Sequence, residues 1–341
     1  MAQINKPNQY FNTKLYTGNG SSGHAITGVG FQPDFTWIKK RSTTGTHSLF
    51  DVVRGVEKRI RTDDTAAEDT SSNYLSSFNA DGFTVNNDAG TNQDTITLAS
   101  WNWLGANGTA ANTDGTISST VSANTTSGFS IVKFTGTGAN ATVGHGLGVA
   151  PSMILFKNYS SANNWLVYNK NLGATKFLYL NVTDAEGTDT GHFNNTEPTS
   201  SVFTVGTANG TNKNAENIIA YCFAEKQGYS KFGSYTGNGS TDGTFVYTGF
   251  KPAYVLIKKT SGTAQWKILD NKRDTFNVVD ALINASNSGA ESTFTTLDFT
   301  SNGFKMRNSD ADMNGSGETY IYMAFAENPL VGTNNIPATA R

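Results

Sequence analysis

The sequence predicts an all-β protein made of three tandem antiparallel β-sandwiches. Thr, Val, Ile, Tyr and Phe are abundant, and these residues suit the half-buried, pleated surface of a sheet. Turns are supplied by 35 Gly and by many Asn, Asp and Ser, which tolerate positive φ or bond their own backbone. A unit of about 100 residues recurs three times, which is the size of a small β-sandwich.

The first strand and turn of each unit carry a shared motif. It reads Tyr-Thr-Gly-Asn-Gly at 16–20, Phe-Thr-Gly-Thr-Gly at 134–138 and Tyr-Thr-Gly-Asn-Gly at 235–239. The first copy, with Gly23, also matches the dinucleotide fingerprint, but that fingerprint needs a helix directly after it. The residues that follow are not expected to form one. The sequence therefore favours a strand that ends in a Gly-x-Gly turn.

A proline opens the second strand of each unit, and a lysine ends it. Proline lacks an N–H group and is tolerated at the first residue of a strand. The strands read Phe-Thr-Trp-Ile-Lys at 35–39, Met-Ile-Leu-Phe-Lys at 153–157 and Tyr-Val-Leu-Ile-Lys at 254–258, and they follow Pro33, Pro151 and Pro252.

Further strands of each unit correspond downstream. They lie at 47–51, 165–169 and 266–270, at 82–85, 202–205 and 303–306, and at 100–104, 220–225 and 322–327. The stretch 320–326 is apolar on both faces, so we expect the closing strand to be central and covered on each side. One apolar run, 278–283, is predicted to form a single helical turn, with little helix elsewhere.

These matches divide the chain into three domains and a tail. The β-sandwich repeats are predicted at 11–110, 127–228 and 229–330, and residues 331–341 form a C-terminal tail. The joint at 105–113 is rich in Gly, Ala and Asn and predicts a flexible linker. The joint at 226–232 is short and aromatic, so we expect the second and third units to pack against each other.

The composition excludes several classes of protein. Lys+Arg total 25 against 27 Asp+Glu, so the basic excess of a nucleic-acid binder is missing. A single cysteine, Cys222, allows neither an internal disulfide nor a C-x-x-C metal site. No apolar run is long enough to span a membrane, and the N-terminus has no signal-peptide pattern.

One acidic loop is a candidate calcium site. Asp310, Asp312 and Asn314 place oxygen ligands at alternate positions, followed by a glycine. The place of the closing glutamate of an EF-hand is taken by Ile321, so only a shorter loop between strands would bind calcium. The alternative is an Asx-rich hairpin turn, and no other cofactor is expected.

Two tryptophans, Trp165 and Trp266, hold equivalent positions and are candidate ligand-binding residues. An exposed indole on a sandwich stacks on the face of a sugar, whereas a buried one fills the space between sheets. No paired acids, zinc-binding histidines or nucleophile elbow recur among the units, so the sequence predicts no catalytic residues and no enzyme.

The motifs resemble a module of structural proteins of marine, cyanophage-type tailed phages. Besides the Tyr-Thr-Gly-Asn-Gly motif, they are Gly-Val-Gly-Phe-Gln-Pro-Asp at 28–34, Gly-His-Gly-Leu-Gly-Val-Ala-Pro-Ser at 144–152 and Tyr-Ile-Tyr-Met-Ala-Phe-Ala-Glu-Asn-Pro at 320–329. The resemblance covers residues 8–341. It implies a concanavalin-A-like or laminin-G-like jelly roll and a place on the virion, and it implies no catalytic residues.

From the repeat and the resemblance together, we expect a non-enzymatic phage virion surface protein. The first hypothesis is a tail-fibre protein or adhesin that displays lectin-like sandwiches to a host glycan. The second is a capsid decoration or head-fibre protein that binds coat subunits, and the third is a glycan depolymerase. Expected partners are other virion proteins and a host surface glycan, without nucleic acid or membrane insertion, and a homo-oligomer is expected.

Overall fold

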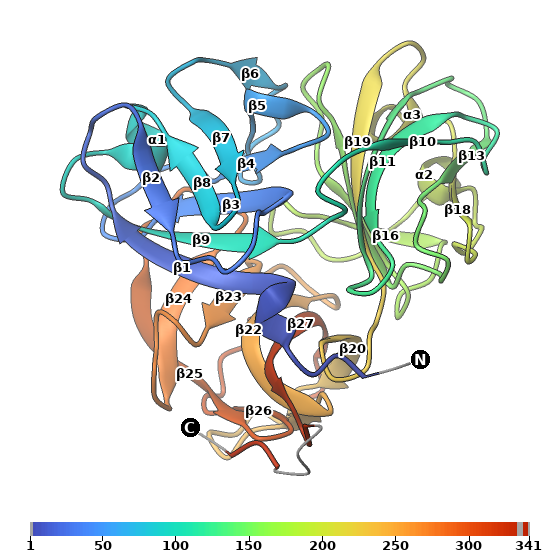
Figure 1. Cartoon of the computed structure of the whole chain (residues 1–341). Helices are drawn as coiled ribbons and strands as arrows, with labels where there is room; N and C mark the ends of the chain where they lie inside the picture. Colours follow the sequence, from blue (N-terminus) through green and yellow to red (C-terminus); the bar gives the residue numbers. More distant parts are fainter. Residues whose placement is uncertain (1–2, 333–336, 340–341) are drawn as a thin grey trace.

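The computed structural model describes residues 3–332 and 337–339, so the predicted tail at 331–341 lies partly outside the described residues. The prediction of an all-β protein is confirmed. Helix in the described residues is limited to four short segments, η1 (Pro7–Gln9), α1 (Ala89–Asn92), α2 (Thr190–Phe193) and α3 (Asn209–Asn212). Every paired strand in the sheets is antiparallel to its neighbour, and three lobes surround a common centre (Figure 1).

The first lobe, residues 11–103, has a large and a small sheet. The large sheet has the order β1 (Phe11–Thr17), β9 (Thr97–Trp103), β3 (Phe35–Lys40), β4 (Ser48–Asp51), β5 (Gly55–Ile60) and β6 (Asp69–Thr70). The small sheet contains β2 (His24–Thr27), β8 (Gly82–Val85) and β7 (Leu75–Asn79).

The second lobe, residues 110–223, repeats this order and adds two strands at one edge. Its large sheet contains β10 (Ala110–Asn112), β11 (Ser119–Asn124), β12 (Phe129–Thr135), β19 (Asn217–Phe223), β14 (Met153–Asn158), β15 (Leu166–Asn169), β16 (Lys176–Tyr179) and β17 (Gly187–Thr188). The small sheet pairs β13 (Ala141–Gly144) with β18 (Val202–Val205).

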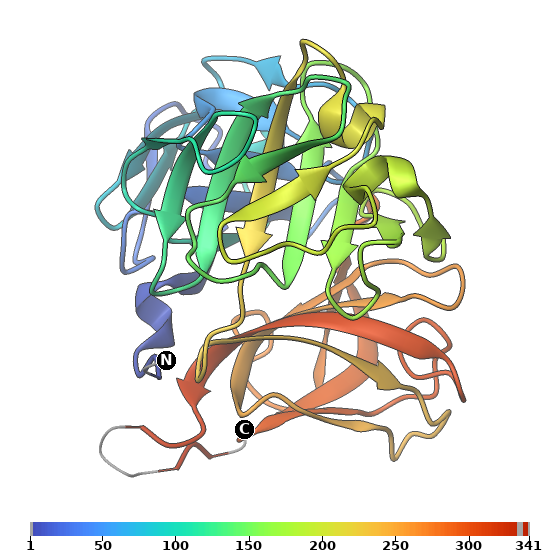
Figure 2. The same cartoon turned by 90° about the vertical axis from the view of Figure 1, so that its right-hand side faces the viewer.

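The third lobe, residues 230–329, is one continuous sheet that curls over itself. Its order is β20 (Ser230–Thr236), β27 (Thr319–Pro329), β22 (Phe250–Lys259), β23 (Lys267–Asp270), β24 (Val279–Asn284), β25 (Ser292–Thr300), β26 (Gly303–Met306) and β21 (Phe245–Tyr247). Figure 2 shows this orange-to-red lobe below the green-to-yellow second lobe.

The helical turn predicted at 278–283 is wrong, because this stretch forms β24. Val279 and Leu282 pack in the core of the third lobe, whereas Ile283 packs in the core that the lobes share. An apolar run covered on both faces has no period that distinguishes a strand from a helix. Pairing with β23 and β25 decides the outcome.

The closing strand of each lobe is central, as the sequence predicts. β9 lies between β1 and β3, β19 lies between β12 and β14, and β27 lies between β20 and β22. In β27, every residue from Tyr320 to Ala326 is buried. These strands therefore support packing on two faces, one toward the small layer of the lobe and one toward the centre of the molecule.

The largest apolar core is shared by all three lobes. It contains Trp101 and Trp103 of the first lobe, Tyr221 of the second, and Tyr254 and Phe325 of the third. Separate outer cores fill the space within each lobe. Because the inner faces of the three large sheets meet, the lobes form one fused body around a common centre.

The joint predicted as a flexible linker at 105–113 is instead anchored. Asp34 Oδ2 accepts hydrogen bonds from the backbone N–H of Gly105 at 2.6 Å and of Asn107 at 3.1 Å. Burial raises the pKa of Asp34 to about 6, although these two backbone bonds lower it. The chain then enters the second lobe through β10, ahead of residue 127.

Candidate binding surfaces

The two candidate glycan-stacking tryptophans lie inside the molecule, which corrects their predicted role. Trp165 is 0% exposed and Trp266 is 1% exposed. Trp165 Nε1 donates to the carbonyl oxygen of Arg61 at 2.6 Å, and Trp266 Nε1 donates to that of Tyr179 at 2.8 Å. Neither indole presents a face to solvent, so neither stacks on a glycan. Each one binds its lobe to the preceding lobe.

His47 takes the equivalent place in the first lobe. Its contact with the third lobe completes a cycle in which each lobe is bonded to the one before it. Burial lowers the pKa of His47 to about 3, so the ring is neutral near pH 7. Its Nδ1 accepts a hydrogen bond from Trp37 Nε1 at 2.7 Å, which places the ring proton on Nε2. Nε2 therefore donates to the carbonyl oxygen of Asn284 in the third lobe, at 3.0 Å.

Three buried lysines join the same pairs of lobes. They are the lysines that end the second strand of each unit, Lys39, Lys157 and Lys258. Each ammonium group donates to a carbonyl oxygen of the preceding lobe in the cycle, namely Ser288 at 3.2 Å, Thr65 at 2.9 Å and Thr183 at 2.8 Å. Burial lowers the pKa of each lysine to about 8. Their position at strand ends was visible in the sequence, but their partners were not.

The three side chains of the calcium candidate, Asp310, Asp312 and Asn314, each make a different contact within the protein. Asp310 Oδ1 accepts from the N–H of Asp312 at 2.7 Å, and Asp312 forms an ion pair with Lys267 at 3.0 Å. Asn314 is fully buried, and its Oδ1 accepts from the N–H of Asn238 at 3.1 Å. These side chains do not form an open set of ligands, so the Asx-rich turn is the better interpretation. Among the described residues, no three or more His, Cys, Asp or Glu side chains group as a metal site.

The Gly-x-Gly turn is held by an asparagine that recurs in every lobe. Asn92, Asn212 and Asn314 each accept a hydrogen bond from the residue between the two glycines. A Cβ atom at Gly18 would lie 2.1 Å from the carbonyl oxygen of Gln93. The glycine is thus required for close packing, and a strand rather than a helix follows the first copy.

Large exposed apolar side chains are concentrated in the third lobe. In the described chain they are Phe245, Tyr247, Phe276, Val278, Phe294 and Val331, and Phe276 is the most exposed at 76%. All but Val331 lie in the third lobe. Phe294 also borders a surface groove of about 640 Å³, together with Thr293, Arg307 and Asn308. The sequence analysis did not identify these residues as an exposed set, and it placed Val278 only in the apolar run 278–283.

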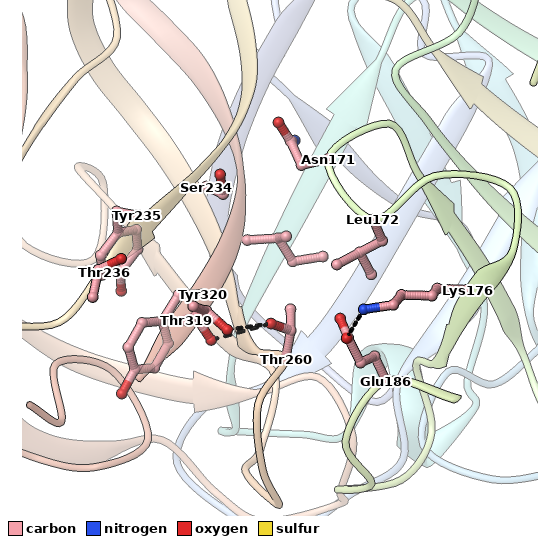
Figure 3. A pocket seen from close by; sticks show the side chains of 11 residues that line it. Asn171, Leu172, Lys176, Glu186, Ser234, Tyr235, Thr236, Thr260, Thr319 and Tyr320 are labelled. Atoms are coloured by element: carbon pink, nitrogen blue, oxygen red, sulfur yellow. Dashed lines mark hydrogen bonds and ion pairs between the residues drawn. The ribbon is translucent and has the colours of Figure 1, made fainter. Parts of the chain in front are cut away.

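A second groove, the β20 groove, runs along the first strand of the third lobe (Figure 3). It has a volume of about 390 Å³ and includes the consecutive residues 234–236 of β20. Its floor carries hydroxyl groups, of which those of Thr260 and Thr319 are 2.8 Å apart. Leu172 and the ion pair between Lys176 and Glu186 line it from the second lobe.

The first lobe has a related groove along β1. Its volume is about 280 Å³, and it is lined by residues 12–15 of β1 with Gly28 and Lys272. Lys272 follows β23 as Asn171 follows β15, so the two grooves occupy corresponding places between lobes. The β1 groove has two lysines and no acid in its lining, whereas the charged side chains of the β20 groove are paired.

The comparison with protein families identifies one match. A model of the family described as a domain of unknown function (DUF7483) matches residues 6–329. No curated protein and no solved structure matches the chain. No helix among residues 3–332 and 337–339 is long and apolar enough to cross a membrane. The family match spans all three lobes, so the family unit corresponds to the whole fused body.

Proposed function

The chain belongs to the DUF7483 family, and we propose that it is a non-enzymatic attachment module on the surface of a phage virion. In this proposal, three concanavalin-like sandwiches are fused into one scaffold, and the third lobe makes the attachment. The motifs that resemble phage structural proteins support the location. The shared core supports the role of a scaffold, because packed sheets hold surface side chains in fixed positions.

The observation that carries the proposal is the concentration of exposed apolar side chains in the third lobe. Solvent-exposed Phe245, Phe276 and Phe294 have no counterpart among the exposed large apolar residues of the first two lobes. Exposed apolar surface beyond single scattered residues marks interaction sites on soluble proteins. Buried aromatic anchors commonly dominate the energy of protein interfaces. The partner that fits best is therefore another virion protein, as in capsid decoration or a head fibre.

A host glycan is the second candidate partner, as a tail-fibre adhesin would require. The groove at Phe294 favours it, because an exposed ring there adjoins threonine hydroxyls and the Asn308 amide. Small-ligand sites combine apolar rings with a few polar groups in this manner. Trp165 and Trp266 have no part in this candidate, since both are buried.

Localisation on the intact particle tests the proposal. Virions labelled with an antibody to this chain should show it on the capsid or at the base of a fibre. Purified Phe276→Ser should rebind to particles stripped of the protein at least about tenfold more weakly than wild type, as expected for a central aromatic contact. Asn87→Ser, at an exposed residue of the first lobe, is the control.

Phe276 is 76% exposed, so its replacement should not unfold the chain. Label at the distal tip of the tail, with unchanged rebinding of Phe276→Ser, would favour the adhesin. A chain found only in infected cells and never on particles would overturn both versions of the proposal.

A further inference from the structure

The outer edge of the first strand is paired in one lobe and unpaired in the other two. In the second lobe, β12 pairs with β19 on one side and with β11 on the other. In the third lobe, β20 pairs with β27 alone, and in the first lobe, β1 pairs with β9 alone. The same edge of the same sheet is thus covered by a strand in one lobe and left without one in two.

The segment before each lobe explains the difference. The second lobe is preceded by the long connection after residue 103, which supplies β10 and β11. Only residues 224–229 separate β19 from β20, which is too short a segment to return along the edge as a strand. A strand at the β20 edge must therefore come from elsewhere.

The backbone of β20 is oriented to accept such a strand. The N–H of Gly237 donates to the Glu318 carbonyl at 2.9 Å, and the N–H of Ala326 donates to the Tyr229 carbonyl at 2.8 Å. Bonding alternates along an antiparallel pair, so Gly233 and Tyr235 face β27. Ser234 and Thr236, which are both exposed, consequently turn their N–H groups away from β27. Among the described residues, these N–H groups have no acceptor.

The β20 groove lies over the face of the sheet next to this open edge, across the ends of β20 and β27. Ser234 and Thr236 pair with Ile321 and Thr319 across the sheet, and their side chains line the groove. Leu172, with the ion pair of Lys176 and Glu186, forms a wall from the second lobe.

We propose that the β20 edge binds one extended segment of a partner protein, which adds antiparallel to the sheet as β11 does in the second lobe. The chemistry of the segment follows from the groove and from β11. β11 reads Ser-Thr-Val-Ser-Ala-Asn and bears no charge. The groove offers hydroxyl groups, one leucine and a compensated ion pair. The partner segment is therefore an uncharged strand of Ser, Thr, Ala and Val.

This inference adds a second contact to the proposed attachment module and does not depend on it. Strand addition uses backbone hydrogen bonds for affinity and alternate side chains for specificity. Unprotected edges are avoided in monomeric proteins because they pair with other chains. The β1 edge carries Lys14 and Lys272 in its groove, so it matches an uncharged strand less well.

A labelled peptide with the sequence of residues 117–125, which contains β11, tests the proposal on the full-length protein. Fluorescence anisotropy should show binding to wild type, and Ser234→Pro should weaken it at least about tenfold by removing an edge donor. Ser234→Ala keeps the N–H and should bind within about twofold of wild type. The residue before the proline is Gly233, which tolerates the restriction that proline imposes.

Amide hydrogen exchange on the unmodified protein gives an independent result if Ser234→Pro fails to fold. Gly233 and Tyr235 should exchange slowly, and Ser234 and Thr236 should exchange fast until the peptide is added. Absence of peptide binding, equal binding to Ser234→Pro, or slow exchange at Ser234 in the free protein would overturn the proposal. Self-association that Ser234→Pro abolishes would also overturn it, because the occupant would then be a second copy. Loss of particle rebinding by Phe276→Ser is a separate result, so the two proposals fail independently.

Discussion

At the residue scale, Asp270 and Arg273 show how the chain accommodates buried charge. Both side chains are 0% exposed, and Arg273 Nε lies 2.5 Å from Asp270 Oδ2. Trp101 of the first lobe also donates to Asp270 Oδ2, at 3.0 Å. Burial alone would raise the pKa of Asp270, but Arg273 and the other donors bring it below its ordinary value. The carboxylate therefore stays charged inside the molecule.

The first lobe repeats this buried ion pair, and the second lobe has two neutral residues in its place. In the first lobe, Asp51 pairs with Arg54 at 2.6 Å and accepts from Tyr221. In the second lobe, the equivalent residues are Asn169 and Leu172. Both the acidic and the basic residue of the pair are therefore replaced by neutral residues. The Nδ2 atom of Asn169 is buried without a partner in the structure. Loss of the whole pair avoids an isolated charge, which is far more costly than one unpaired amide.

A double-mutant cycle tests this account. Arg273→Leu should lower the free energy of unfolding by roughly 3–5 kcal/mol, because it leaves Asp270 charged and buried. Asp270→Asn with Arg273→Leu reproduces the second-lobe pair and should cost at least about 2 kcal/mol less than the sum of the single changes. Urea denaturation of the four proteins measures the cycle. Additive losses would show that the pair does not act as a unit.

At the scale of elements, three equivalent strands connect the lobes through a lysine next to their last residue. β3, β14 and β22 contain Lys39, Lys157 and Lys258, each bonded to carbonyl oxygens across a lobe boundary. Their pKa values near 8 lie below that of an unfolded lysine, 10.5. Between these values the unfolded chain binds more protons than the folded one, so the free energy of unfolding rises with pH.

We therefore expect stability to increase between pH 7.5 and 9.5, by about 1–2 kcal/mol per lysine. Above this window the buried tyrosines with raised pKa, such as Tyr221, reverse the trend. Urea midpoints measured across the window give the slope, and Lys157→Met should reduce it by about one third. An unchanged slope in this variant would assign the effect to other groups. The comparison uses only the slope of stability against pH, so a lower overall stability of Lys157→Met does not affect it.

Many of the strands were predictable from the sequence. The strands at 35–39, 153–157 and 254–258, and the central closing strands, followed from β-branched and apolar patterns that depend only on neighbouring residues. The strand at 279–284 was not predictable, since its apolar side chains face two cores. The anchored joint depends on Asp34, and the open edge of β20 depends on which strand lies beside it. Both are consequences of tertiary contacts between residues distant in sequence.

The candidate sites also combine features that the sequence predicts with features that depend on tertiary contacts. Trp165 and Trp266 were correctly recognised as equivalent, but their burial depends on the lobes facing one another. Asp310 and Asp312 had the spacing of a calcium loop, and in the structure one oxygen of Asp310 accepts within a local turn and one oxygen of Asp312 pairs with Lys267. Spacing along the chain does not reveal partners supplied by another strand. Exposed Phe276 was missed because a lone phenylalanine in a polar loop has no pattern.

At the scale of the whole molecule, the shared core makes each lobe dependent on the others. The second lobe contributes Trp165, Tyr221 and Phe223 to that core, and all three are buried in a cluster that residues of the other lobes complete. Removal of the second lobe exposes this face and breaks the bonds that Trp165, Trp266, Lys157 and Lys258 make across its boundaries. Exposed apolar surface of this extent destabilises an isolated domain and promotes aggregation.

We therefore expect the full chain to unfold in one cooperative transition and an excised second lobe, residues 110–228, not to fold as a monomer. Urea titrations followed by near-UV circular dichroism and tryptophan emission measure both. In the full chain the emission of buried indoles should be blue-shifted and change in a single step. In the fragment, Trp165 is the only tryptophan, and it should emit as a solvated indole or report an aggregate. A monomeric fragment with a sharp transition and blue-shifted emission would mean that the lobe is stable without its neighbours. The inter-lobe bonds would then position three independent sandwiches, and the central core would contribute to their arrangement and not to their folding.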